Sequence, residues 1–245
     1  MSNITIFDQS IPSIGYTARS TTYGEEFEMV NKFIDEIIKK KDSLSRKRID
    51  IFIEPQIETG YPDIVIAEYY MSKKFHWCDD RHNLTNNDLK ILFEIQKANK
   101  LPISKLEELL GFSKQDLNKS LSKLSKSNMI NIFNSSECVG SVNIGKYSRI
   151  NKIIAIEAKV DKWNEAIRQA TNNTWFATES YILMNKEKCD ESIVQLCKDR
   201  GIGIILMNGK IQKKLDSEKR NFPVSYSSLL FNEWIFRKIY QQEEE

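Results

Sequence analysis

The chain has 245 residues, of which 40% are hydrophobic and 29% are charged, with 36 Lys and Arg residues against 34 Asp and Glu residues. This length allows one large domain or a domain with a smaller module, and the composition excludes a wholly disordered chain. No run approaches the ~18–20 apolar residues of a membrane span, and the N-terminal residues lack a secretory signal pattern. A formal net charge of +2 does not by itself indicate a polyanionic partner.

The cysteines are too scattered for a metal site or a disulfide framework. They lack CxxC spacing, and the two histidines stand apart from most of them. We therefore expect reduced thiols in a cytoplasmic protein. The segment His76-Trp77-Cys78-Asp79-Asp80 has too few spaced ligands for a metal and is interpreted as a linker.

The first part of the chain predicts one helix and two strands. Apolar residues at i, i+3 and i+7 predict a helix over about residues 23–41. The run Ile49–Ile53 predicts a strand, and a second strand is expected over residues 63–70. Between them, Thr59-Gly60-Tyr61-Pro62 predicts a turn, because Gly accommodates positive φ and Pro has a fixed φ.

From about residue 86 the pattern changes to short helices. The expected elements are helices over 86–99, 103–110 and 113–128, then a hairpin with strands over 129–133 and 139–144. Gly111 is the expected C-cap of the second helix and Ser113 the N-cap of the third. Three helices with a tight turn between the last two, followed by a hairpin, predict a winged helix-turn-helix over residues 82–150.

After residue 151 strands and helices alternate. The expected elements are strands over 153–160, 180–184 and 202–207 and helices over 162–176, 190–200 and 226–240. This alternation predicts a mixed or parallel sheet that is covered by helices. We therefore expect residues 1–75 and 151–245 to form one α/β domain, into which the helical module is inserted.

Charged residues on the predicted strand 153–160 point to a chemical site. Glu157 and Lys159 share one face of a strand because side chains alternate with a period of two. If the strand beginning at Asp63 pairs with this strand, an Asp, a Glu and a Lys converge. Two carboxylates suit Mg²⁺ or Mn²⁺, and a lysine can orient or help to deprotonate a water and offset charge at a phosphoryl centre. Each residue alone also fits an ordinary charged strand end or turn.

Pro62-Asp63 at one strand and Glu157-Ala158-Lys159 on the next, followed by a helix, resemble the signature of the PD-(D/E)xK, or restriction-endonuclease-like, nuclease superfamily. The resemblance covers the outer parts of the chain and implies a core of helix, three-stranded meander, helix and strand. It implies that Asp63 and Glu157 bind the divalent metal and that Lys159 serves the hydrolytic water. The spacing between Asp63 and Glu157 exceeds the usual hairpin connection by the length of the inserted module.

The same resemblance implies two further site residues. Members similar to archaeal Holliday junction resolvases carry a glutamate in the first helix soon after a glycine, which matches Glu28, with Glu25 as a competitor. The RecB-like branch carries a glutamine on the helix after the Glu-x-Lys strand, which matches Gln169. The tyrosine that usually follows four residues later is absent here. Glu28 also fits a solvated glutamate in the first turn of a helix.

The inserted module holds the positive charge of the chain. Between residues 81 and 150, eleven Lys and Arg residues stand against six Asp and Glu residues, so this segment carries +5 and the remainder −3. A basic module is the electrostatic footprint of phosphate contact, and the outer face of the third helix lies where a recognition helix reads bases. The expected DNA-binding residues are Lys114, Gln115, Asn118, Lys119, Ser122, Lys123, Lys126 and Lys146. A solvated helix face, or a module for protein interaction or dimerisation, would have a similar pattern.

We therefore expect an α/β fold with a restriction-endonuclease-like mixed sheet flanked by helices and an inserted winged-helix domain. The expected function is that of a restriction-like DNA endonuclease that depends on Mg²⁺ or Mn²⁺, with no organic cofactor and no membrane partner. It would act on double-stranded DNA as a homodimer with one site per chain. Two alternatives stay open. One is a non-catalytic DNA-binding or regulatory protein on a nuclease-like scaffold, and the other is a structure-selective resolvase or repair nuclease.

Overall fold

The computed structural model describes residues 3–19, 23–40, 47–70 and 77–241. They belong to two compact units, the first formed by residues 1–70 and 150–224 and the second by residues 71–149 and 225–245. In the part of the chain that is described, no helix has the length and apolar character needed to cross a membrane. The four cysteines are free thiols, and His76 of the expected linker lies outside the described residues.

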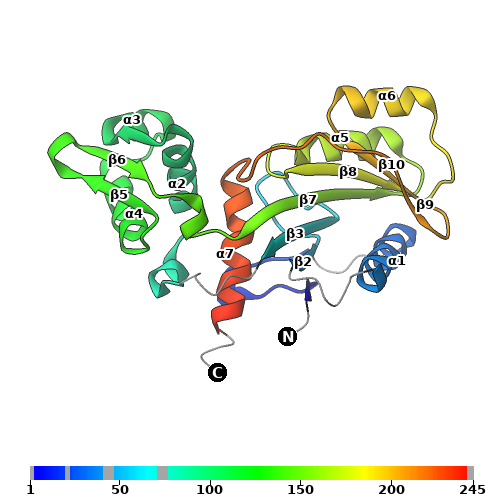
Figure 1. The fold of residues 1–245 in the computed structure, drawn as a ribbon, viewed down its shortest axis with the longest axis horizontal. Helices are drawn as coiled ribbons and strands as arrows, with labels where there is room; N and C mark the ends of the chain where they lie inside the picture. Colours follow the sequence, from blue (N-terminus) through cyan, green and yellow to red (C-terminus); the bar gives the residue numbers. More distant parts are fainter. Residues whose placement is uncertain (1–2, 20–22, 41–46, 71–76, 242–245) are drawn as a thin grey trace. The chain divides into compact units, whose positions relative to one another are not determined.

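The first unit is an α/β layer structure built on a seven-stranded mixed sheet (Figure 1). Its strands are β1 (Ile4–Phe7), β2 (Lys47–Ile53), β3 (Ile64–Tyr70), β7 (Ile150–Lys159), β8 (Glu179–Met184), β9 (Gly203–Met207) and β10 (Ile211–Leu215). Its helices are α1 (Glu25–Lys40), α5 (Trp163–Asn173) and α6 (Glu191–Asp199), with a 3₁₀ turn, η1 (Pro12–Ile14). The predicted α/β class, with a mixed sheet flanked by helices, is confirmed.

The sheet order is β1-β2-β3-β7-β8-β9-β10. Strands β2, β3 and β7 form an antiparallel meander, and β8 and β9 continue the sheet in parallel. At the edges, β1 pairs parallel with β2, and β10 pairs antiparallel with β9. The order α1, β2, β3, β7, α5, β8 therefore gives a helix, three antiparallel strands, a helix and a parallel strand.

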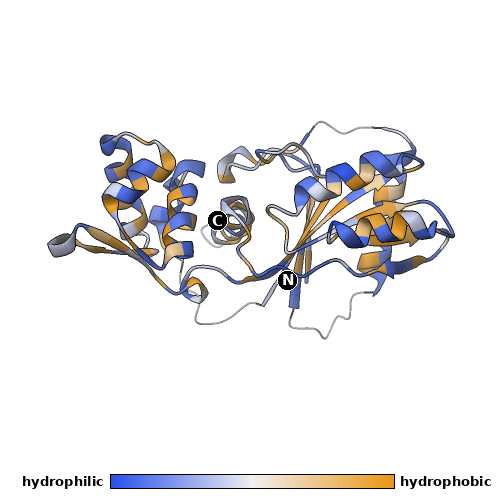
Figure 2. Ribbon diagram, turned by 90° about the horizontal axis from the view of Figure 1, so that it is seen from above, coloured by the Kyte–Doolittle hydropathy of each residue, from blue (hydrophilic) through white to orange (hydrophobic). Residues whose placement is uncertain are grey.

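Helices cover both faces of this sheet. Helix α1 buries Met29, Val30 and Phe33 against one face, where Ile156 and Ala158 of β7 belong to the same apolar cluster. Helices α5 and α6 cover the opposite face with a second apolar cluster. Figure 2 shows the strands as largely hydrophobic, whereas the helices also carry hydrophilic positions. Because successive side chains of a strand point to opposite faces, Glu157, which lies between Ile156 and Ala158, points away from α1.

The second unit combines helices with a small antiparallel sheet in the order β4-β6-β5. Its elements are α2 (Asn86–Ala98), β4 (Lys100–Pro102), α3 (Ile103–Leu110), α4 (Lys114–Lys126), β5 (Ile130–Phe133), β6 (Cys138–Ser141) and α7 (Tyr226–Gln241), with 3₁₀ turns η2 (Asp79–Asn83), η3 (Asn134–Ser136) and η4 (Ile144–Lys146). The expected caps are present: Gly111 has φ 65°, and the Ser113 side chain accepts a hydrogen bond from the Asp116 amide at 3.1 Å. Leu109 of α3 is 53% exposed.

Helix α7 belongs to this second unit, whereas the sequence pattern assigned residues 225–245 to the α/β domain. Its Glu233 forms a buried ion pair with Arg81, with an Nη2–Oε1 distance of 2.5 Å and an Nε–Oε2 distance of 3.1 Å. Its Arg237 donates hydrogen bonds to the carbonyl oxygens of Arg81 and Leu84 at 3.0 and 2.7 Å. These contacts join segments about 150 residues apart in sequence, so a local pattern does not predict them.

Candidate active site

The register of β3 against β7 brings Asp63 to Glu157. Ile64 lies opposite Ile156 in this antiparallel pair, so extending the register by one residue places Asp63 opposite Glu157. The Asp63 Oδ2 atom accepts a hydrogen bond from the Ala158 amide at 2.7 Å. The carboxylate of Asp63 is therefore held on the β7 backbone, next to the Glu-Ala-Lys segment.

Glu157 carries a buried carboxylate with an unequal environment for its two oxygens. The side chain is 3% exposed, and its Oε1 accepts a hydrogen bond from Asn173 Nδ2 of α5 at 2.6 Å. Its Oε2 is buried and has no hydrogen-bond partner in the described part of the chain. Burial, followed by the charge of Asp63, raises the pKa of Glu157 well above its usual value. Burial also raises the pKa of Asp63, and the nearby Glu26 and Glu54 carboxylates add to this effect.

Lys159 places a cation beside these carboxylates. Its Nζ lies 3.0 Å from Glu26 Oε2 and 3.8 Å from Asp63 Oδ2, and it donates to the Ala158 carbonyl oxygen at 3.1 Å. Burial by itself lowers the pKa of Lys159, but the Asp63 and Glu26 carboxylates outweigh it, so the pKa is raised. Lys159 is thus held as an ammonium group at the end of β7.

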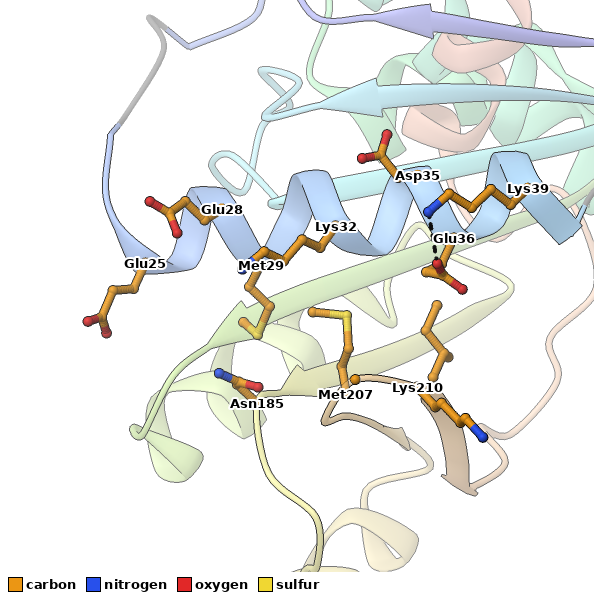
Figure 3. Close-up of a pocket in the computed structure, with 12 residues that line it drawn as sticks. Glu25, Glu28, Met29, Lys32, Asp35, Glu36, Lys39, Asn185, Met207 and Lys210 are labelled. Carbon is orange, nitrogen blue, oxygen red and sulfur yellow. Dashed lines mark hydrogen bonds and ion pairs between the residues drawn. The ribbon is translucent and has the colours of Figure 1, made fainter.

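The structure does not bring Glu28 to this group. Glu28 and Glu25 line a depression of about 620 Å³ together with Met207 and Lys210, and Figure 3 shows Glu28 at the start of α1. Residues two apart on an α-helix differ by about 200° in direction, so Glu26 and Glu28 face different sides. Glu26 is the glutamate of α1 that reaches Lys159.

The sequence held a signal for Glu26. It precedes Val30 by four residues and Phe33 by seven, and both of these side chains are buried against the sheet. Helical periodicity therefore places Glu26 on the stripe of α1 that faces the sheet. Position in the first turn alone did not separate it from Glu25 and Glu28.

Gln169 lies one turn before Asn173 on α5, and residues i and i+4 share a helix face. Its Oε1 is buried and has no hydrogen-bond partner among the described residues. Asn173 occupies the position four residues later, where the family resemblance implies a tyrosine. Sequence reasoning missed Asn173, although it is the residue on α5 that donates to Glu157.

The donor set fits a hard divalent cation such as Mg²⁺ or Mn²⁺. The two carboxylates lie close together, Glu157 is buried and Asp63 is partly buried, and Glu157 Oε2 is left without a partner. No group of three or more His, Cys, Asp or Glu side chains suited to a metal occurs within the described ranges. Mg²⁺ is often held by only one or two carboxylates, together with waters and substrate phosphate. Asp63 and Glu157 would be the protein ligands.

The proposed reading helix α4 carries an exposed polar face opposite its buried leucines. The exposed residues of the expected set are Lys114, Gln115, Asn118, Lys119, Ser122, Lys126 and Lys146. Lys123 differs, because its Nζ lies 3.3 Å from Asp88 Oδ2 and 3.2 Å from the Asn83 carbonyl oxygen. Lys146 lies in η4, after the hairpin rather than within it.

In comparisons with protein-family models, with curated proteins and with solved structures, the chain matches none of them.

Proposed function

We propose that this protein is a divalent-metal-dependent DNA endonuclease that hydrolyses phosphodiester bonds. The observation that carries this proposal is the convergence of Asp63, Glu157 and Lys159 at adjacent ends of β3 and β7. The order of helix, antiparallel meander, helix and parallel strand supports a restriction-endonuclease-like core for the first unit. The unpartnered Glu157 Oε2 supports a metal-binding role for this carboxylate.

Each side chain has a distinct role in this proposal. Asp63, fixed by the Ala158 amide, and Glu157, fixed by Asn173, would hold Mg²⁺. A divalent cation held there offsets negative charge on the scissile phosphate and favours deprotonation of water. The Lys159 ammonium group, oriented by Glu26, would position the attacking water and stabilise charge on the phosphoryl oxygens.

The second unit supports a role in binding duplex DNA. The succession α2, β4, α3, α4, β5 and β6, with β4 paired to the hairpin, supports the winged helix-turn-helix assignment. Exposed basic and amide side chains on α4 suit contacts to phosphates and base edges. One active site per chain suits cleavage of one strand, so cutting both strands would involve a homodimer.

Cleavage of plasmid DNA tests this proposal. The purified protein should nick or linearise supercoiled plasmid in the presence of Mg²⁺ or Mn²⁺, and chelation should stop the reaction. Lys159→Ala should abolish cleavage while leaving the fold intact. Equal cutting by the wild type and this variant would refute the assignment.

A non-catalytic DNA-binding protein is the second candidate. It is favoured by the contacts of Lys159, whose Nζ is already engaged by Glu26 Oε2 at 3.0 Å and by the Ala158 carbonyl oxygen at 3.1 Å, as in a purely structural ion pair. Calorimetric titration with Mn²⁺ separates the two proposals. A working site should bind Mn²⁺ in a manner that Asp63→Asn and Glu157→Gln weaken, whereas DNA binding without metal binding would favour the second candidate.

A further inference from the structure

Three aromatic residues lie close in sequence to residues of the candidate active site, one in each of three segments that form it. Tyr23 precedes Glu26 by three residues, Tyr61 precedes Asp63 by two, and Trp175 follows Asn173 by two. An extended chain spans at most about 3.6 Å per residue, so each aromatic Cα lies within about 11 Å of the Cα of its site residue. We call Tyr23, Tyr61 and Trp175 the aromatic rim.

The loop that carries Tyr61 is held in a defined conformation. The Ile57 and Gly60 backbones exchange hydrogen bonds at 3.0 and 3.1 Å, and Gly60 has φ 128°, which L side chains rarely adopt. At the base of the loop, the Glu54 amide donates to the Asp63 carbonyl oxygen at 3.1 Å. Tyr61 is nevertheless 39% exposed, so an ordered loop presents its ring to solvent beside Asp63.

Trp175 and Arg19 meet the same loop. The Trp175 indole Nε1 donates to Thr59 Oγ1 at 3.0 Å, which brings the end of α5 to the turn before Tyr61. The Arg19 guanidinium carbon lies 5.9 Å from the centre of the Tyr61 ring. Its backbone amide donates to the Glu54 carbonyl oxygen at 3.0 Å. An exposed cation therefore accompanies the aromatic rim.

Tyr23 completes the rim on the side of α1. Its side chain is 90% exposed, and its ring centre lies 6.4 Å from that of Phe27 in an edge contact. Glu26, one turn further along, contacts Lys159. Tyrosine rings carry large apolar faces that favour stacking partners, so an almost fully exposed ring beside a phosphoryl-transfer site suits a planar ligand.

Resting on the proposed nuclease function, we infer that the substrate is DNA with an unpaired strand at the cleavage site. Unpaired bases would stack on the aromatic rim, and Arg19 would contact a backbone phosphate. Aromatic side chains bind successive bases of single strands by stacking, whatever the sequence. Within a continuous duplex, neighbouring base pairs cover the faces of each base, so these faces cannot stack on the aromatic rim. We therefore expect the protein to bind forked or bubble-containing DNA in preference to blunt duplex.

Binding without cleavage tests the inference directly. The binding measurements use the double variant Asp63→Asn/Glu157→Gln in the presence of a chelator. This variant lacks two negative charges of the site, so a DNA phosphate can approach without a bound cation. Fluorescence anisotropy then compares a forked DNA with a blunt duplex that has the same paired region. The fork should bind at least about 5-fold more tightly, and Tyr61→Leu should lower its affinity by about 5- to 100-fold, with little effect on the blunt duplex.

Two further variants separate stacking from other effects. Tyr61→Phe keeps the aromatic face and should retain affinity for the fork. Tyr70→Leu is the matched control, since Tyr70 is also an exposed tyrosine, 51% exposed, but lies at the opposite end of β3 from Asp63. Equal affinity for fork and blunt duplex, or equal effects of Tyr61→Leu and Tyr70→Leu, would overturn the inference.

The outcome is independent of whether the protein cleaves DNA. If the wild type with Mg²⁺ cuts blunt duplex and fork alike, the nuclease proposal stands and the substrate inference fails. If binding is selective for the fork and depends on Tyr61, but no DNA is cut, the nuclease proposal fails and the rim is supported as a binding surface for unpaired bases.

Discussion

Replacing Glu157 by glutamine removes a buried charge while keeping the size of the side chain. In the wild-type protein, Oε2 has no hydrogen-bond partner in the described structure, and the Asp63 carboxylate is adjacent. Glutamine keeps an oxygen that can accept from Asn173 and adds an amide that can donate toward Asp63. Without metal, the substitution should therefore relieve an unfavourable interaction rather than remove a favourable one.

The expected gain follows from the cost of the unpaired oxygen. Leaving a buried polar atom without a partner costs about 1–3 kcal/mol, and more for a charged group. We expect Glu157→Gln to raise the free energy of unfolding of the metal-free protein by about 1–3 kcal/mol, measured by urea denaturation in chelator near neutral pH. Glu28→Gln is the control, an exposed α1 glutamate that should shift the value by less than about 0.5 kcal/mol.

The pH dependence of this gain has a defined sign. Folding raises the pKa of Glu157 above its ordinary value of 4.5. Such a group stabilises the folded state below its unfolded pKa and loses this contribution as the pH rises through the folded value. The difference in free energy of unfolding between Glu157→Gln and the wild type should therefore be largest near neutral pH and should vanish near about pH 4.

Metal should reverse the order of stability. Mg²⁺ at 100 times its Kd stabilises the wild type by about 2.7 kcal/mol if it binds only the folded state, and Glu157→Gln should lose most of this effect. A destabilising effect of Glu157→Gln in chelator, or a change no larger than that of Glu28→Gln, would refute the idea of an uncompensated carboxylate.

Three further variants test other parts of the structure. Asn173→Ala removes the amide that orients the buried carboxylate and should weaken Mn²⁺ binding by about 10- to 100-fold in calorimetry; unchanged affinity would contradict this role. Arg81→Met removes the ion-pair partner of the buried Glu233, which keeps one hydrogen bond from Asn232. It should therefore destabilise the protein by about 3–5 kcal/mol in urea, and adding Glu233→Leu should restore most of the loss. Lys119→Ala should lower the slope of log affinity against log salt concentration for duplex binding by about one. Lys123→Ala should leave this slope unchanged, because its Nζ is bonded to the buried Asp88 carboxylate, whereas Lys119 lies 3.8 Å from the exposed Asp116.

The elements that the sequence predicted well are those with strong local patterns. Helices α1, α2, α4 and α5 have apolar stripes, and Gly111 and Ser113 mark the turn between α3 and α4. Strands β1, β4 and β10 were missed for a physical reason. Strand β10 has three exposed residues in a row, and β4 is three residues long and ends in Pro102. Such strands are defined by their pairing with β9 and β6, which is not visible in a local pattern.

The candidate site was predictable to the extent that backbone geometry defines it. Strand alternation placed Glu157 and Lys159 on one face, and the turn before Asp63 set the start of β3. The periodicity of the buried residues of α1 favours Glu26 over Glu28. The contact of Glu26 with Lys159, however, depends on how α1 docks on the sheet, and the role of Asn173 depends on where α5 crosses β7. These are tertiary relations, and so is the association of α7 with the second unit through Arg81.

The most direct test of the central claim is the rate of plasmid cleavage by Lys159→Ala beside Lys162→Ala. Lys162 lies three residues further along the chain, with its side chain 74% exposed, so it controls for loss of one positive charge near the site. With Mg²⁺, Lys159→Ala should lose at least about 100-fold in rate, while Lys162→Ala and the wild type should cut alike. Similar cleavage by all three proteins, or an absence of metal-dependent cleavage in the wild type, would contradict the account.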